Sequence, residues 1–276
     1  MSYGKIKAEK HPPQLDKVDL GRKLKDEETY ERRLKALQLD MLNLQQAYQR
    51  QGRRGIIVLE GWDTAGKGGL IRRMSARLDP RNFRVWPIGA PLPAEQGRHY
   101  LYRFWKRLPE PGMIAVFDRS WYGRVLVERV EGLAKKAEWK RAYEEINEVE
   151  RMLTDAGARL VKLFLHITPE AQLERFRERL SVPYKRWKLT AEDLRNRRHW
   201  AEYETAIDEM FRRTSTTFAP WHAVPSVFKW YGRVKALELI RDTLGKDVDV
   251  TPPPADPETE AVIAAMIEAE AARLKA

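Results

Sequence analysis

Residues 56–74 read IIVLEGWDTAGKGGLIRRM, and this stretch decides the fold. Its first residues are β-branched or leucine and follow a glycine, which is typical of a short buried strand. A glycine-containing loop, Gly61–Lys67, comes next and leads into a segment of helical pattern. In such a unit, backbone N–H groups surround phosphate oxygens, the lysine adds positive charge, and the helix dipole attracts the anion. The stretch therefore predicts a phosphate-binding loop, and a structural glycine turn is the competing interpretation.

The loop departs from the usual pattern at one position. A loop of this kind normally ends in Ser or Thr, whose hydroxyl binds magnesium, and here Gly68 follows Lys67. The metal then needs another oxygen ligand, and Asp63 inside the loop is the candidate. We predict that phosphate is bound along the loop by Gly61, Thr64, Ala65, Gly66 and Gly68.

Hydrophobic patterns predict further strands and helices in alternation. The strands are expected at residues 83–88, 113–117, 160–167 and 224–228. The helices are expected at residues 27–51, 68–78, 94–108, 136–156, 169–180, 200–213 and 232–244. Strands that alternate with helices favour an α/β fold with a parallel, doubly wound sheet flanked by helices.

A second acidic residue, Asp118, stands at the end of the predicted strand 113–117. Ligands bind at the carboxyl edge of open α/β sheets, so Asp118 is a candidate magnesium ligand beside the phosphate-binding loop. Arg119 and Arg124 follow it and can stabilise negative charge on a phosphoryl group. The alternative is an Asp–Arg pair that caps a helix at the surface, and the neighbouring loop makes this the minority view.

Residues 181–200 are strongly basic. Six Lys and Arg residues stand against two acidic residues, which gives a net charge of +4. Aromatic residues such as Trp187 lie between them, so the segment is a poor candidate for the core. We hypothesise that it is a lid which closes on phosphates and excludes water. In this hypothesis the phosphates are bound by Lys185, Lys188 and Arg198. The alternative interpretation is that the segment is a basic helix face exposed to solvent.

The composition narrows the classes of partner. The chain of 276 residues has 51 Lys and Arg against 40 Asp and Glu, a net charge of +11, so an anionic partner is expected: nucleic acid, an acidic membrane or a phosphate-rich molecule. No stretch approaches the roughly 20 apolar residues of a membrane span, and the first residues lack the apolar core of a secretory signal. We therefore expect a cytoplasmic location and no membrane partner. The absence of cysteine excludes disulfides and thiolate metal sites, and the five histidines do not have zinc-site spacing.

Composition also predicts the domain organisation. Residues 1–26 are polar and basic and are expected to form an N-terminal arm. Residues 27–246 are expected to form the phosphate-binding domain, and residues 247–276 a proline-rich linker and a C-terminal tail. The alanine- and glutamate-rich end of this tail is either a separate surface helix or a partly ordered segment.

Several separate motifs resemble the polyphosphate kinase 2 family. They are LEGWDTAGKGG at 59–69, FDRSWYGR at 117–124, VE at 127–128, WKLT at 187–190 with Asp193, and TSTT at 214–217 with APW at 219–221. The resemblance covers about residues 27–245. It is closest to the active half of the polyphosphate:AMP phosphotransferases, in RVWPIGAP at 84–91 and GRVLVERVEG at 123–132.

The resemblance implies a thymidylate-kinase-like P-loop fold with a helical lid and direct, reversible phosphoryl transfer from inorganic polyphosphate to a nucleotide. It implies a catalytic core of Asp63, Lys67, Asp118 and Arg119, with Arg124 and the basic lid residues binding phosphate. It also implies Mg²⁺, with Mn²⁺ as a substitute, and a homodimer or homotetramer. AMP or ADP is the expected acceptor, with GMP and GDP as further candidates.

A mechanism follows from both lines of argument. An acceptor phosphate is already anionic near neutral pH, so positioning and charge neutralisation are expected to dominate. Asp63 and Asp118 would hold the metal, and Arg98 and Arg103, in residues 91–107, are the candidates for binding the nucleotide. The rival functions are an ATP-dependent nucleotide or small-molecule kinase and a nucleic-acid-binding protein. The second rival leaves the phosphate-binding loop unexplained, so we expect no nucleic-acid partner.

Overall fold

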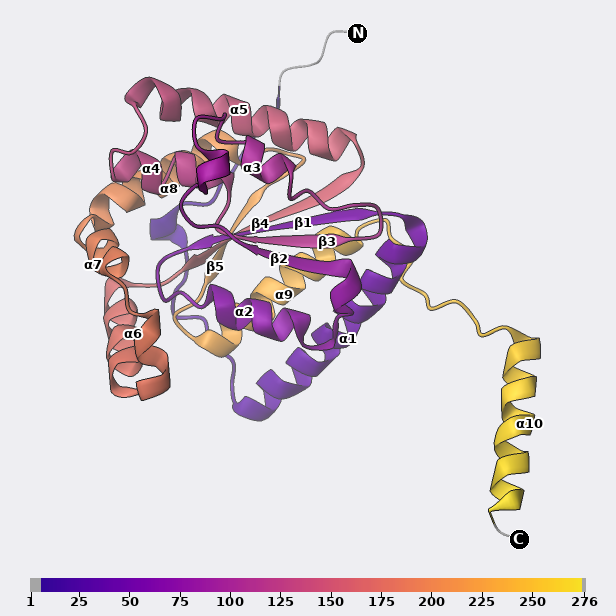
Figure 1. Ribbon diagram of the computed structural model, residues 1–276. Helices are drawn as coiled ribbons and strands as arrows, with labels where there is room; N and C mark the ends of the chain where they lie inside the picture. Colours follow the sequence, from indigo (N-terminus) through magenta and orange to yellow (C-terminus); the bar gives the residue numbers. More distant parts are fainter. Residues whose placement is uncertain (1–5, 275–276) are drawn as a thin grey trace.

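The computed structural model describes residues 6–274 as a parallel sheet with helices on both faces (Figure 1). All neighbouring strands pair in parallel, in the order β2-β3-β1-β4-β5. The strands are β1 Arg54–Gly61, β2 Phe83–Pro87, β3 Ile114–Asp118, β4 Ala158–His166 and β5 Trp221–Pro225. The predicted α/β class is confirmed.

Helices cover the sheet on both sides (Figure 1). One face carries α1 Glu27–Gln51, α2 Lys67–Met74 and α9 Lys229–Gly245. The other carries α3 Tyr102–Trp105, α4 Val127–Val130, α5 Lys136–Asp155 and α8 Trp200–Thr214. Beside the sheet lie α6 Pro169–Ser181 and α7 Ala191–Arg198, and α10 Pro257–Arg273 stands apart. Short 3-10 turns are Leu15–Lys17, Ser75–Arg77, Pro80–Asn82, Pro93–Glu95, Trp121–Arg124 and Pro183–Lys188.

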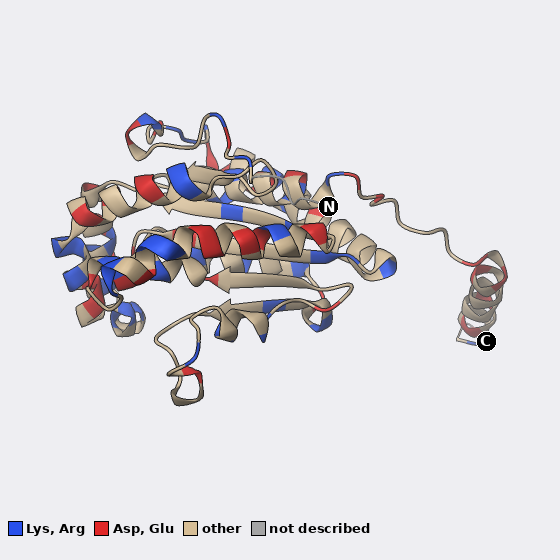
Figure 2. Cartoon of the chain, turned by 90° about the horizontal axis from the view of Figure 1, so that it is seen from above, with Lys and Arg blue, Asp and Glu red and all other residues tan. Residues whose placement is uncertain are grey.

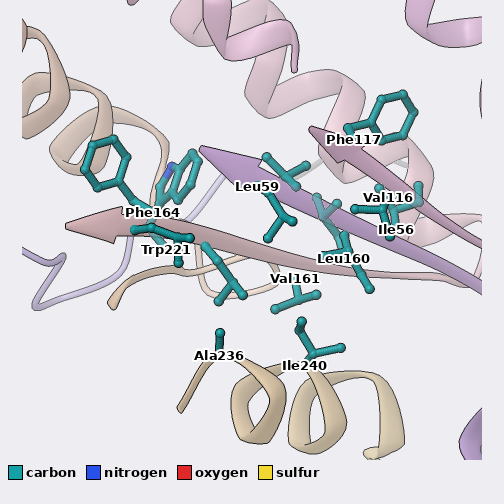
Figure 3. Close-up of a cluster of buried hydrophobic side chains, with 14 of the residues drawn as sticks. Ile56, Leu59, Val116, Phe117, Leu160, Val161, Phe164, Trp221, Ala236 and Ile240 are labelled. Atoms are coloured by element: carbon teal, nitrogen blue, oxygen red, sulfur yellow. The ribbon is translucent and has the colours of Figure 1, made fainter. Parts of the chain in front are cut away.

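The core explains why the central strands are continuously apolar. β1 lies in the middle of the sheet, so both of its faces are covered, and Ile56 to Leu59 are fully buried. Figure 3 shows the side chain of Val161 in β4 lying over Ala236 and Ile240 of α9. A strand buried on both faces has no polar alternation, which is why the pattern of residues 56–59 alone identified it.

Two elements differ from their predictions. The helix expected at 94–108 is broken into a 3-10 turn and the single turn of α3, because Gly97 adopts a φ of 72° and Glu95 accepts a hydrogen bond from the N–H of Leu92. The strand expected at 224–228 is β5, which begins three residues earlier. It ends at Pro225, after which Ser226 donates its N–H to the carbonyl of His166.

The two ends of the described chain behave differently. The arm packs on the body, since Leu15 is buried and Ala8 pairs with Thr216 in an isolated bridge. α10 begins at Pro257 and is capped by Asp256, and all of its residues are exposed. Residues 1–5 and 275–276, part of the predicted arm and tail, lie outside the described residues. In residues 6–274, no helix is both long and apolar enough to cross a bilayer.

A fully buried ion pair ties the sheet to α5. Lys162 in β4 donates to Glu150 at 2.7 Å, and both side chains are completely inaccessible to solvent. Tyr122 and Trp121 also donate to Glu150, at 2.7 and 3.1 Å, and Lys162 donates to the carbonyl of Thr214 at 2.7 Å. Burial lowers the pKa of Lys162, and the carboxylate beside it opposes the shift. The network therefore holds the turn Trp121–Arg124 against the sheet.

Replacing Glu150 by Gln is expected to lower the free energy of unfolding by about 3–5 kcal/mol, because it leaves the buried Lys162 charge uncompensated. Urea unfolding followed by circular dichroism measures the change. Glu148 on the same helix is half-exposed and pairs with Arg151, so Glu148→Gln is the matched control, with an expected change of about 0.5 kcal/mol or less. Equal losses in the two variants would contradict the assignment.

Candidate active site

The loop between β1 and α2 has the backbone shape that its glycines predict. Gly61 has a φ of 147°, and a Cβ there would lie 2.7 Å from the carbonyl oxygen of Leu165, so no other residue fits. Gly66, at a φ of 113°, is the N-cap of α2. Lys67 donates from Nζ to the carbonyl of Gly61 at 2.9 Å, which keeps its ammonium group at the loop. Together these features give the strand, loop and helix N-terminus that suit the binding of a phosphate group.

Two residues without glycine's freedom also adopt positive φ at this site. Thr64 has a φ of 66° and Arg119 one of 64°. Such conformations cost on the order of 1–3 kcal/mol each and persist only where surrounding contacts enforce them. For Thr64 the contact is Arg175, which donates to its carbonyl at 2.8 Å and also to that of Ser226 at 2.5 Å. Burial lowers the pKa of Arg175 to about 10, and it remains a cation near neutral pH.

Asp63 is the most heavily engaged of the predicted site residues. Its Oδ1 accepts from Arg119 at 3.0 Å and its Oδ2 accepts from Asn196 at 2.6 Å. Gln172 donates to its backbone carbonyl at 3.2 Å. Only 11% of the side chain is exposed. The carboxylate is therefore held in one orientation by groups from two separate segments, and a third segment holds the backbone of Asp63.

Arg119 links this carboxylate to α7. Its second guanidinium nitrogen donates to Glu192 at 2.8 Å. Burial alone would lower the pKa of Arg119, but the charges of Asp63 and Glu192 outweigh it and raise the pKa, so the guanidinium is permanently charged. The side chain thus has the fork geometry and charge that suit a phosphoryl group.

Asp118 ends β3 beside β1, paired in register with Leu59. It is half-buried, and no side chain within residues 6–274 donates a hydrogen bond to its carboxylate. Glu60 is its buried neighbour and accepts from the hydroxyl of Ser120 at 2.7 Å. Burial raises the pKa of Glu60, against the effects of Ser120, Lys67 and Arg119, and the charge of Asp118 adds to the rise. The site therefore offers acidic oxygens next to fixed positive groups.

The donor set agrees with a hard cation shared with a substrate. No group of three or more His, Asp or Glu residues in the described part of the chain could hold a metal. Asp63 and Asp118 each offer hard carboxylate oxygens, and Mg²⁺ usually binds proteins through one or two carboxylates and completes its shell with water and phosphate. Two carboxylates are enough for such an ion, so the residues present fit it.

Two neighbouring cavities open at this edge of the sheet. The larger, of about 620 Å³, is lined by Asp63 and Arg119 on one side and by Leu126, Tyr203 and Ile207 on another. The smaller, of about 270 Å³, is lined by three arginines that the sequence singled out, Arg98, Arg103 and Arg124. Pro91, Arg103 and Glu128 line both cavities. The two cavities therefore adjoin each other, and the smaller one is lined both by arginines and by the carboxylates Glu95 and Glu128.

The three arginines of the smaller cavity differ in how far other groups hold and bury their side chains. Arg103 is buried and donates to the carbonyl of Gly89 at 3.0 Å. The guanidinium of Arg124 lies 4.6 Å from the ring centroid of Tyr100 and pairs with Glu128 at 3.1 Å. Arg98 is exposed and lies 4.5 Å from the ring centroid of Tyr102. Arg98 is therefore the member whose charge is open to an incoming anion.

The predicted phosphate-binding residues of the lid lie apart from the loop. Lys185 pairs with Glu178 at 2.6 Å, and hydrogen bonds from Lys185 and Lys229 lower the pKa of Glu178 to about 2. Lys188 lies 5.3 Å from the ring centroid of Trp187, and Arg198 is exposed. Across residues 6–274, none of the three predicted residues forms an ion pair with the loop. Figure 2 shows basic residues gathered at the end of the molecule that α6 and α7 form.

Sequence reasoning missed the lid residues that do reach the loop. Glu192 contacts Arg119, and Asn196 contacts Asp63. In the sequence, Glu192 is one of the two acidic residues of the basic segment 181–200. The i,i+4 spacing of Glu192 and Asn196 is a usable signal, because it places both on one face of α7. Gln172 and Arg175 of α6, which hold the loop backbone, have the equivalent i,i+3 spacing on one face of that helix.

Comparisons with known proteins agree with this geometry. A family described as Polyphosphate kinase 2 matches residues 24–250. The chain is 46% identical over 232 residues to a polyphosphate:AMP phosphotransferase of Pseudomonas syringae pv. tomato, covering 84% of this chain and 46% of that protein. It is 39% identical over 247 residues to ADP-polyphosphate phosphotransferase 2 of Rhizobium meliloti, covering 88% and 78%.

A solved structure resembles this chain over nearly its whole length. Polyphosphate kinase 2 from Arthrobacter aurescens superposes with a TM-score of 0.85 at 33% identity, covering 94% of this chain and 95% of that one. The chain spans about half the length of the polyphosphate:AMP phosphotransferases it matches, for example 46% in the P. syringae protein.

Proposed function

The chain belongs to the polyphosphate kinase 2 family, and from this premise we propose that it transfers a phosphoryl group from inorganic polyphosphate to a nucleotide. The preferred reaction converts AMP to ADP, and ADP to ATP is the second candidate. The relatives named as polyphosphate:AMP and ADP-polyphosphate phosphotransferases support it. The observation that carries the proposal is the meeting of the phosphate loop, Asp118 and Arg119 at one edge of the sheet, beside two cavities.

In this proposal, the catalytic residues are Asp63, Lys67, Asp118 and Arg119. Lys67 and Arg119 hold the terminal phosphate of the polymer, and Arg124 adds positive charge from the adjoining cavity. Asp63 and Asp118 would hold Mg²⁺, or Mn²⁺ in its place, whose charge offsets that of the donor and acceptor phosphates. No side chain needs to act as a strong base, because the attacking phosphate oxygen is already anionic.

The acceptor nucleotide is assigned to the smaller cavity. Its phosphate would meet Arg98, whose charge is open, and Arg103, which lines both cavities. Because three residues line both cavities, an acceptor phosphate in the smaller cavity would lie beside the larger one, which the loop lines. GMP and GDP are further candidate acceptors.

The lid completes the proposed site. Lys185, Lys188 and Arg198 would contact the polymer after the lid moves, because in this conformation they make no ion pair with the loop. Closure would exclude water and limit loss of the phosphoryl group to hydrolysis. A homodimer or homotetramer, a cytoplasmic location and the absence of a nucleic-acid partner stay predictions.

An assay of donor and acceptor tests the proposal. The purified chain is incubated with Mg²⁺ and either polyphosphate or ATP, together with AMP, ADP, GMP or GDP, and the nucleotides are separated by chromatography. We expect ADP to form from AMP with polyphosphate at a rate at least tenfold above that with ATP. A faster reaction with ATP would replace the proposal by its rival, an ATP-dependent kinase. No transfer from either donor would reject both.

A further inference from the structure

We propose that Glu192 and Asn196 of α7 form a latch that holds the lid over the phosphate loop by occupying the atoms that bind substrate. Glu192 accepts a hydrogen bond from a guanidinium nitrogen of Arg119, and Asn196 donates one to an oxygen of Asp63. The identity of the competing ligands, phosphate and metal, rests on the proposed function. The latch itself rests on contacts within the chain.

The chemistry of the two contacts mirrors that of the ligands. Glu192 presents a carboxylate to Arg119 at 2.8 Å, in the way that a phosphate oxygen would. Asn196 presents a hydrogen-bond donor to Asp63 at 2.6 Å, where a cation would otherwise draw the carboxylate. A negative group therefore lies where an anion is expected, and a positively polarised group lies where a cation is expected.

In the proposed latch, the two sets of contacts compete. Arg119 already uses its other Nη nitrogen on Asp63, so a phosphate that takes both Nη nitrogens would have to replace Glu192. Each oxygen of Asp63 already accepts a hydrogen bond, from Arg119 or from Asn196, and only 11% of the side chain is exposed, so an ion at Asp63 competes with these contacts. Release of α7 would therefore favour the binding of magnesium polyphosphate.

The lid segment is anchored to the rest of the chain at both of its ends. It can therefore move without unfolding of the site. At its carboxyl end, Trp200 stacks on Trp62 of the loop, with ring centroids 3.6 Å apart and planes at 5°. Trp62 in turn donates to His166 at 2.9 Å, and burial lowers the pKa of that histidine to about 4, so it is a neutral acceptor near pH 7. At its amino end, α6 is held by Arg175.

Between these two anchors, the segment buries few of its side chains. Residues 182–190 bury no side chain, and Leu194 of α7 is 60% exposed. Trp187 is 76% exposed. Besides the latch, α7 contacts the rest of the chain through Arg195, which lies 3.6 Å from Glu131 and is mostly exposed. Arg197 of α7 also donates to the carbonyl of Pro169 at 2.8 Å and to Gln172 at 3.0 Å. The latch supplies the contacts to Arg119 and Asp63, so its loss should loosen the segment.

Proteolysis measures the latch without any need for activity. The lid holds trypsin sites at Lys185, Arg186, Lys188, Arg195, Arg197 and Arg198. With no substrate added, the double variant Glu192→Ala/Asn196→Ala is expected to be cut in the lid about tenfold faster than the native chain, as for loss of one charge-assisted hydrogen bond. Leu194→Ala, an exposed site on the same helix, is the matched control and should be cut at the native rate.

Ligand affinity gives the second measurement. Magnesium polyphosphate is titrated calorimetrically into each variant without nucleotide. The double variant is expected to bind about tenfold more tightly, because the native chain must first release the latch. The single variants Glu192→Ala and Asn196→Ala should each show part of the effect, and they replace the double variant if it fails to fold.

The results separate the two proposals. Unchanged cleavage, or affinity that is equal to or weaker than that of the native chain, overturns the latch even when the native chain is an active transferase. A large fall in kcat with weaker binding would instead make both residues positioning residues of the reactive state, and this also overturns the latch. Failure of the proposed function is recognised in the native chain, if it binds polyphosphate but transfers no phosphoryl group.

Discussion

Asp118→Asn is expected to lower kcat for AMP phosphorylation by about a thousandfold while the protein stays folded. The substitution removes one negative charge from the proposed metal site and keeps the size of the side chain. Groups that stabilise developing charge in a water-excluded site contribute roughly 10²–10³ each, and a metal contact is at the upper end of that range. Initial rates at saturating polyphosphate and AMP, over a range of Mg²⁺ concentrations, measure the loss.

The structure makes this variant easy to interpret. In the described chain no side chain donates to Asp118, so Asn leaves no buried partner unsatisfied and the melting temperature should hardly change. Asp242→Asn is the control, because Asp242 is 62% exposed on α9 and pairs with its neighbour Arg241. If kcat of Asp118→Asn stayed within about threefold of the native value, Asp118 would not be a metal ligand.

The second large effect is expected at Arg119. Arg119→Ala should lower kcat by about 10³–10⁵, the range measured when an arginine that contacts a transferring phosphoryl group is removed. Arg119 is suited to that role because its charge is permanent and its side chain is oriented by Asp63 at 3.0 Å. Its backbone has a φ of 64°, a conformation that the fold enforces at some cost, as expected for a functional position.

Arg119→Lys separates charge from geometry. Lysine keeps the positive charge but lacks the planar fork, so we expect an intermediate loss, roughly tenfold to a hundredfold in kcat. Thermal unfolding of each variant controls for the effect of a new residue at positive φ. Equal activity of the Ala and Lys variants would show that the charge has no role, and native activity of Arg119→Ala would remove it from the catalytic set.

Local sequence was sufficient for the phosphate loop and for the strand beside it. Ile56 to Leu59 form a run that only a central strand explains, and Gly61 and Gly66 stand where the backbone needs positive φ. These features depend on residues close in the chain, so a pattern over about twenty positions contains them. The same holds for Asp118, since the carboxyl end of a parallel strand always lies at the ligand-binding edge.

Local sequence failed where distant segments decide the conformation. Residues 94–108 have helical periodicity, yet the positive φ of Gly97 breaks the helix, and Glu95 pairs with Arg103 and Arg107. Of these two arginines, Arg103 lines the cavities. The buried pair of Glu150 and Lys162 was not foreseen either, because on sequence alone both are ordinary surface charges.

The sequence by itself determined the fold class, the phosphate loop and the chemical type of the proposed substrate. These features depend on charge and on patterns among residues that are close together in the chain. Only the tertiary structure decided what those residues touch. Asn196 reaches Asp63 across 133 positions, and Glu192 reaches Arg119 across 73. Such contacts depend on how α6, α7 and α8 pack beside the sheet, and the free energy of that packing is the sum of many weak contacts that no local pattern records.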